Sequence, residues 1–305
     1  MRRSIHSLVL FLAIGFAPQL AFADNKSDSA THYKAGMAYK AQGKNDEAIE
    51  SLEKAVAADA KHGEAWASLG HLYKQKDDIK KSIDAYEHAT ALIPKSVTIW
   101  SNLGMAYYRD GRPDDALVAL EKACRLDPKD ADIQANIGAI KRQKKDIPGA
   151  IKHLEWATKL APKQHQYWNN LGVAYRADNR NEDAIKALEK AVELGPNEAE
   201  YHFNLAVVYR RTEDVEKAIP QYEQATALKP DYSDAWYDLG YMYKLNHEND
   251  KAIDAFNKYL ELTGGSDATA AKTAEDEIKG MGGTPTKEKP KGKGKGKGKG
   301  KSGSK

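Results

Sequence analysis

Apolar residues recur at steps of three and four between positions 29 and 266, with polar residues between them. This spacing is typical of amphipathic helices that bury one face. Turn-forming residues such as Gly43 and Gly111-Arg112-Pro113 interrupt the apolar pattern, which indicates pairs of helices joined by tight turns. The pattern therefore predicts an all-α fold of fourteen antiparallel helices.

The helical pattern repeats every 34 residues. A small residue marks the same point in seven successive units: Gly36, Gly70, Gly104, Gly138, Gly172, Ala206 and Gly240. A large side chain at this point would overpack the unit by about 1–3 kcal/mol, so we expect the two helices of each unit to approach closely there. Such a period predicts a stacked array in which each unit buries its apolar face against its neighbours.

Other positions follow the same period. Tryptophan precedes the small residue by four in these units: Trp66, Trp100, Trp168 and Trp236. Tyrosine follows it by three: Tyr39, Tyr73, Tyr107, Tyr175, Tyr209 and Tyr243. The combined pattern W-x-x-L-G-x-x-Y, followed by alanine and a closing proline, resembles the tetratricopeptide repeat family. The resemblance implies a right-handed superhelical solenoid of seven helix-turn-helix units, at 29–62, 63–96, 97–130, 131–164, 165–198, 199–232 and 233–266.

The two ends of the chain differ from the repeats. Residues 267–280 are rich in Ala, Lys and Glu and follow a potential N-cap at Ser266-Asp267, so we expect a helix that caps the last repeat. Residues 1–23 combine Arg2 and Arg3 with an apolar run and a small-residue cleavage motif. This layout predicts a secretory signal peptide, followed by a short linker at 24–28, in a periplasmic or secreted protein. An uncleaved N-terminal membrane anchor is the alternative.

Charge is segregated along the chain. The total is +3, but residues 286–305 hold nine lysines and one glutamate. Residues 281–305 are expected to form a disordered Lys/Gly-rich tail, because glycine disfavours a helix and the lysines repel one another. The lysines proposed to contact an anionic surface are Lys291, Lys293, Lys295, Lys297, Lys299 and Lys301. A membrane or an anionic envelope polymer would suit them, and a purely solubilising tail is the alternative. Nucleic acid is a less expected partner in an exported protein.

One asparagine stands two residues before the small residue in four consecutive units. This asparagine ladder consists of Asn102, Asn136, Asn170 and Asn204. The resemblance places the first helix of each unit on a concave groove, and an amide there could pair with any peptide group. A similar ladder grips peptides in the superhelical repeat domain of O-linked N-acetylglucosamine transferases. The alternative is that asparagine at this point has no binding role.

A basic residue follows the small residue by four in six of the seven units. This basic ladder consists of Lys40, Lys74, Arg142, Arg176, Arg210 and Lys244, and Arg211 adjoins it. Cations on the same groove would favour a protein or extended peptide with acidic character, whereas a merely solvated face is the other interpretation. The Lys and Asn pair of the carboxylate clamp that characterises chaperone-binding members of the family is absent.

Aromatic residues outside the repeat pattern gather near the C-terminal end of the expected groove. They are Phe203, Tyr237 and Tyr241. Exposed aromatic residues beside arginine are typical of binding hot spots, and stacking between adjacent units is the alternative. We expect these residues to extend the partner-binding surface.

No motif of an enzyme is found in the chain. The pair His247-Glu248 lacks the second histidine of a zinc helix, because position 251 is lysine, and neither a nucleophile elbow nor a phosphate loop occurs. We therefore expect no catalytic site, metal or cofactor. The sequence favours a non-enzymatic scaffold for protein interactions, with assembly of envelope, secretion or pilus machinery as an analogy. A binder of anionic polymer acting through the tail is the rival hypothesis.

Overall fold

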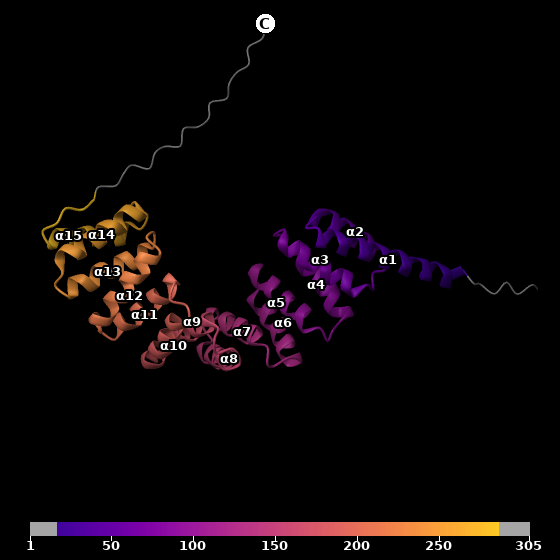
Figure 1. The fold of residues 1–305 in the computed structure, drawn as a ribbon, viewed down its shortest axis with the longest axis horizontal. Helices are drawn as coiled ribbons and strands as arrows, with labels where there is room; N and C mark the ends of the chain where they lie inside the picture. Colours follow the sequence, from indigo (N-terminus) through magenta and orange to yellow (C-terminus); the bar gives the residue numbers. More distant parts are fainter. Residues whose placement is uncertain (1–16, 287–305) are drawn as a thin grey trace, which may run out of the picture. The chain divides into compact units, whose positions relative to one another are not determined.

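The computed structural model describes residues 17–286, and these form fifteen α-helices (Figure 1). The predicted lysine sites of the tail and most of the predicted signal peptide lie outside the described residues. The helices are α1 (Ala17–Ala41), α2 (Asn45–Ala58), α3 (Gly63–Gln75), α4 (Ile79–Leu92), α5 (Val97–Arg109), α6 (Pro113–Leu126), α7 (Ala131–Gln143), α8 (Ile147–Leu160), α9 (His165–Ala177), α10 (Asn181–Leu194), α11 (Ala199–Arg211), α12 (Val215–Leu228), α13 (Ser233–Leu245), α14 (Asn249–Thr263) and α15 (Ala268–Gly280). The expected all-α repeat fold is thus confirmed.

Residues 24–28 form part of helix α1, so the predicted linker is wrong. The sequence from Asp24 to Asp28 contains neither glycine nor proline, and nothing there ends a helix. The helix is also held at its next residue, because the buried Ser29 hydroxyl donates a hydrogen bond to the Ala55 carbonyl at 2.8 Å.

The small residues of the repeat allow the two helices of a hairpin to touch. A Cβ atom added to Gly172 would lie 2.5 Å from Leu188 Cγ, and one added to Gly104 would lie 2.7 Å from Leu120 Cγ. Both distances are far below van der Waals contact. The close approach that the sequence predicted is therefore present, and glycine is required by packing at these positions.

A second repeated contact joins each hairpin to the preceding loop. The side chain four residues before the small residue donates to the carbonyl six residues earlier, as in Trp100 Nε1 to Pro94 O at 3.0 Å. Gln134 replaces tryptophan in its unit and makes the same bond to Pro128 O at 3.0 Å. A donor side chain is the requirement at this position, which explains why glutamine can stand there.

Tyrosine hydroxyls link consecutive hairpins. Five of the tyrosines that follow the small residue by three, all except Tyr39, donate to a glutamate 20 residues earlier, for example Tyr175 to Glu155 and Tyr209 to Glu189, both at 2.7 Å. The second helix of one unit is therefore tied to the first helix of the next, which is the neighbour-only stabilisation of a repeat array.

The turn inside each hairpin uses a left-handed residue at the same 34-residue spacing. Glycine occupies it at Gly43 and Gly111, whereas other residue types occupy it elsewhere with φ between 60° and 64°: Asp77, Lys145, Asn179, Glu213 and His247. Left-handed backbone costs a non-glycine residue about 1–2 kcal/mol.

Replacing Glu213 by glycine is therefore expected to stabilise the protein, by a few tenths to about 1 kcal/mol after the larger unfolded-state entropy of glycine is subtracted. Glu213 is exposed. The control is Gln224→Gly, at an exposed position inside α12, which should cost about 1 kcal/mol. Urea unfolding of the variants measures both changes. If Glu213→Gly destabilised the protein as Gln224→Gly does, the left-handed strain would be disproved.

The chain divides into two compact units, at residues 1–140 and 141–305. In the second unit, apolar residues from α8 to α15 form a continuous core. Helix α15 covers the end of this core with Ala271, Ala274 and Ile278, which are all buried. The carboxylate of Asp267 caps α15 by accepting hydrogen bonds from the backbone N–H groups of Thr269 and Ala270, both at 3.0 Å.

Candidate peptide-binding face

The first helices of the hairpins in the second unit carry most of the predicted site residues. Helix α11 lies against α9, and the buried Asn204 Nδ2 donates to Asn169 Oδ1 at 2.9 Å between them. Arg211 Nη1 donates to the Arg176 carbonyl at 3.2 Å. We call the polar side chains of α7, α9, α11 and α13 within this unit the first-helix face.

The asparagine and basic ladders contact each other instead of standing apart. Lys74 Nζ donates to Asn102 Oδ1 at 2.9 Å, and Arg210 Nη1 donates to Asp238 Oδ1 at 3.0 Å. In both pairs the acceptor lies 28 residues after the base, so the basic residue of one unit reaches the polar residue of the next. The spacing of residues within one unit does not predict this pairing, because the pairing depends on the offset between stacked units.

The asparagine ladder is not a uniform row of free amides. Asn204 is buried and bound to Asn169, so its predicted role as a peptide contact is corrected. Asn102 uses its only acceptor atom for Lys74. Asn136 on α7 and Asn170 on α9 are half-buried, and they remain predicted peptide contacts.

Arg142 and Arg176 differ from Lys74, Arg210 and Lys244 of the basic ladder, which have acceptors. The Arg142 Nε atom is buried and has no hydrogen-bond partner. Among the described residues, no hydrogen bond or ion pair engages the Arg176 guanidinium, which is half-buried. Burial lowers the pKa of Arg176, and the charges of Arg142, Arg211 and Arg210 lower it further. Four guanidinium groups thus gather on one side of the second unit.

The other basic residues of this face are held by internal partners. Arg211 also donates to the Asn179 side chain, and Lys244 forms an ion pair with Glu277 of α15. In the first unit, Arg109 occupies the same register as Arg211 and pairs with Asp77 at 2.7 Å. These contacts fix adjacent units to each other, a role that the spacing of single residue types did not indicate.

The predicted aromatic residues pack against other aromatic rings of their own units. The ring of Phe203 lies 4.8 Å from that of Tyr232, and the ring of Tyr237 lies 4.8 Å from that of Tyr259. Tyr241 meets the Phe256 ring edge-to-face at 5.1 Å. All three predicted residues are half-buried against the core of the second unit. Ring contacts within the units therefore account for much of their surface, and no ring contact between units is found for them among the described residues.

Asp238 is the buried carboxylate of this face. It accepts hydrogen bonds from Arg210 and, through Oδ2, from the Tyr222 hydroxyl at 3.0 Å. Burial raises the pKa of Asp238, with a small further rise from Asp234, and this outweighs the lowering by Arg210 and Tyr222. The folded protein therefore holds a proton on this carboxyl more tightly than the unfolded chain does.

This shift predicts a pH dependence of stability. Because the pKa in the folded state is the higher one, the stability that Asp238 contributes is complete below its ordinary pKa of 3.8 and falls as pH rises through the folded-state value. Asp238→Asn, which keeps a neutral acceptor, is expected to remove this part of the profile. Unfolding free energies of both proteins from pH 4 to 7 measure it. Parallel profiles would contradict the prediction.

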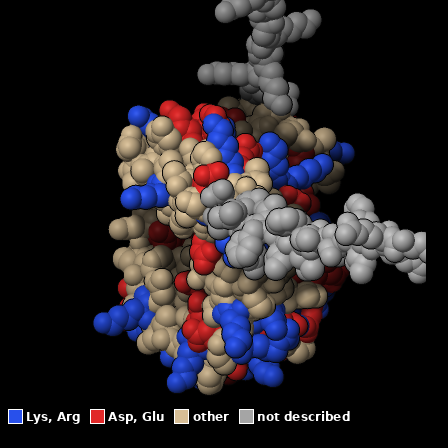
Figure 2. All heavy atoms as spheres, turned by 90° about the vertical axis from the view of Figure 1, so that its right-hand side faces the viewer, with Lys and Arg blue, Asp and Glu red and all other residues tan. Residues whose placement is uncertain are grey.

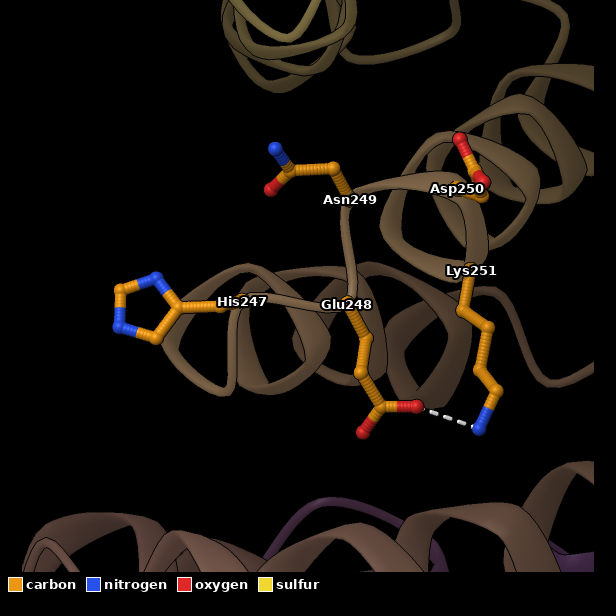
Figure 3. Close-up of a pocket in the computed structure, with 5 residues that line it drawn as sticks. All are labelled: His247, Glu248, Asn249, Asp250 and Lys251. Carbon is orange, nitrogen blue, oxygen red and sulfur yellow. Dashed lines mark ion pairs between the residues drawn. The ribbon is translucent and has the colours of Figure 1, made fainter.

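The surface hollow at the turn between α13 and α14 offers no convergent chemistry. It is lined by five consecutive residues, His247 to Lys251 (Figure 3). Figure 3 shows Glu248 paired with Lys251 while the His247 and Asn249 side chains point away from that pair. Across residues 17–286, no group of three or more His, Cys, Asp or Glu could hold a metal ion. Acidic and basic residues are interspersed on the face in Figure 2.

None of the helices formed by the described residues has both the length and the apolar character that crossing a membrane requires.

Several solved structures share this fold. The C-terminal part of a TPR repeat-containing protein from Cytophaga hutchinsonii matches with a TM-score of 0.65 and 20% identity, over 81% of this chain and 99% of that one. YrrB, described as a TPR protein with an unusual peptide-binding site, matches with a TM-score of 0.54 and 20% identity, over 61% and 96%. PilF of Pseudomonas aeruginosa matches with a TM-score of 0.56 and 20% identity, over 68% and 94%.

Family models give the same assignment from the sequence. No curated protein matches the chain significantly. A model described as the C-terminal domain of cilia and flagella-associated protein 70, a TPR domain, matches residues 4–234, which is more than half of the chain. A tetratricopeptide repeat model matches residues 203–267. With the 34-residue hairpins and their shared contacts, these matches show that the chain belongs to the tetratricopeptide repeat family.

Proposed function

We propose that this protein is a non-catalytic scaffold that binds an extended peptide or protein segment of acidic character on its first-helix face. The observation that supports this most is the gathering of Arg142, Arg176, Arg210 and Arg211 on one side of the second unit, with a single buried carboxylate, Asp238, among them. Excess positive charge on a partly desolvated surface favours an anionic partner. The half-buried Asn170 adds an amide for a peptide backbone.

The fold relationship supports a peptide as the partner. YrrB shares the repeat architecture and is described as having a peptide-binding site. Repeat arrays of this kind present an extended surface built from equivalent side chains of successive units, which suits an extended segment better than a small molecule.

The test is binding of the full chain to an array of end-blocked peptides. Half of the peptides contain Asp or Glu, and the other half have the same sequences with Asn or Gln in those places. We expect selective retention of acidic sequences. The charge reversal Arg176→Glu should abolish this selectivity, whereas Arg125→Glu, at an exposed position of α6, should not. Equal retention of acidic and amide peptides would refute the proposed acidic preference.

A second function is favoured by the end of the described chain. Thr286 donates through its backbone N–H to Asn257 Oδ1 at 2.7 Å, so the last described residue before the lysine-rich segment is held on the surface of α14. We propose that its lysines bind an anionic surface, each adding about 1 kcal/mol near a membrane. Co-sedimentation with vesicles of anionic phospholipid should fall with rising salt and vanish in a chain that ends at Thr286. Salt-independent binding would contradict this.

We also propose that the protein is exported and acts in the cell envelope, with assembly of secretion or pilus machinery as the context. Support comes from the signal-like pattern of residues 1–23 and from the fold shared with PilF. A fusion of the full chain to an alkaline phosphatase reporter, which is active only outside the cytoplasm, tests the location. An inactive, stably expressed fusion would argue against export.

A further inference from the structure

We infer that Arg142 and Arg176 form a receptor for one carboxylate side chain, an aspartate or glutamate, of the bound segment. This inference rests on the proposed peptide-binding function and assigns its main specificity contact. It also separates these two arginines from the neighbouring bases, which serve the fold.

The first support is the contrast within the basic ladder. Lys74, Arg210 and Lys244 each have an acceptor from the following hairpin or from α15. Arg142 and Arg176 are consecutive members of the ladder and lack such an acceptor, with the Arg142 Nε atom fully buried. A buried donor without a partner destabilises the folded protein, and a charged one does so more strongly. An external acceptor would remove this cost.

The second support is that the fold itself withholds the acceptor. The acceptor of Arg210 is Asp238, which lies 28 residues later. The residue 28 positions after Arg176 is Asn204, which is therefore the expected acceptor of Arg176. Asn204, however, is a neutral residue whose amide nitrogen donates to Asn169 at 2.9 Å, and among the described residues no hydrogen bond joins its oxygen to the Arg176 guanidinium. Asp238, the carboxylate that lies 28 residues after Arg210, already accepts from Arg210 and Tyr222. The field at Arg176 therefore stays positive.

The third support concerns the shape of the ligand. A guanidinium group presents a planar fork of donors that matches both oxygens of a carboxylate. Two such groups beside each other, partly removed from water, can bind one carboxylate more strongly than an exposed lysine could. The half-buried Tyr232 lies within electrostatic range of Arg176, whereas Tyr222 is fully buried and presents no surface to a ligand.

The experiment compares end-blocked six-residue peptides that contain one glutamate or one glutamine, titrated calorimetrically into the full chain at about 0.15 M ionic strength, where distant charges are screened. We expect the glutamate peptide to bind at least about tenfold more tightly, as a charged hydrogen-bond pair implies. Arg176→Gln should abolish this preference, and Arg176→Lys should restore only part of it. The matched control, Arg125→Gln, should preserve the preference for glutamate. The tail is identical in all these proteins, so it cannot cause a difference between them.

A gain-of-binding variant guards against loss through misfolding. Asp238→Asn removes the internal carboxylate that occupies Arg210, so it should raise affinity for the glutamate peptide about threefold or more. Unchanged or weaker binding in this variant would overturn the inference. Preference for glutamate that survives Arg176→Gln would overturn it too, while leaving the peptide-binding function intact. If neither peptide binds but sodium glutarate shows an Arg176-dependent signal, the receptor stands and the peptide-binding function fails.

Discussion

Gly172→Leu is expected to destabilise the protein by about 3 kcal/mol or more, the upper end of the cost of overpacking a close helix contact. The added Cβ alone would lie 2.5 Å from Leu188 Cγ and 3.2 Å from the Ala184 carbonyl oxygen. Leu188 is fully buried and has no free space to enter. The hairpin formed by α9 and α10 must therefore open, which also loosens its contacts with the neighbouring hairpins.

The measurement is urea unfolding followed by circular dichroism at 222 nm. The matched control is Gly280→Leu at the end of α15, because a Cβ there meets no atom within 4 Å. That variant should change stability by less than about 0.5 kcal/mol. Equal effects of the two substitutions would show that loss of glycine, and not the close approach of α9 to α10, sets the cost.

The repeat period made the hairpins predictable, because a buried face needs the same residue types at the same places in every unit. The period could not reveal which other residue types can take over the contact of the repeated tryptophan in units that lack it. His202 stands where other units have tryptophan and contacts the Pro196 carbonyl at 2.9 Å, as tryptophan does elsewhere. A search for donor side chains at this position would have found both His202 and Gln134.

The candidate site was harder to predict than the fold. The sequence period locates the residues of the two ladders, but their pairing depends on how far one unit is displaced along the next. That displacement joins Lys74 to Asn102 and buries Asn204. The spacing of residues within one unit does not reveal this displacement. The state of each ladder residue, free or partnered, therefore had to come from the packing of adjacent hairpins.

Tyr222 and Tyr86 occupy equivalent buried positions but are expected to respond oppositely to loss of the hydroxyl. Tyr222 donates to Asp238 Oδ2 at 3.0 Å, so Tyr222→Phe should cost about 1–3 kcal/mol by leaving a buried carboxylate oxygen without that donor. The Tyr86 hydroxyl is buried and has no partner, so Tyr86→Phe should be neutral or stabilise the protein by about 1 kcal/mol. Urea unfolding of both variants provides the comparison.

The difference comes from the number of acceptor atoms in the next hairpin. Asp238 has two oxygens, one for Arg210 and one for Tyr222, whereas the equivalent Asn102 has one oxygen, which Lys74 uses. Asn102→Asp should therefore supply an acceptor to Tyr86, and Tyr86→Phe should become destabilising in that background. A double-mutant cycle measures this coupling, expected at about 1 kcal/mol. Zero coupling would mean that the hydroxyl is satisfied in some other way and that counting acceptors does not explain the two tyrosines.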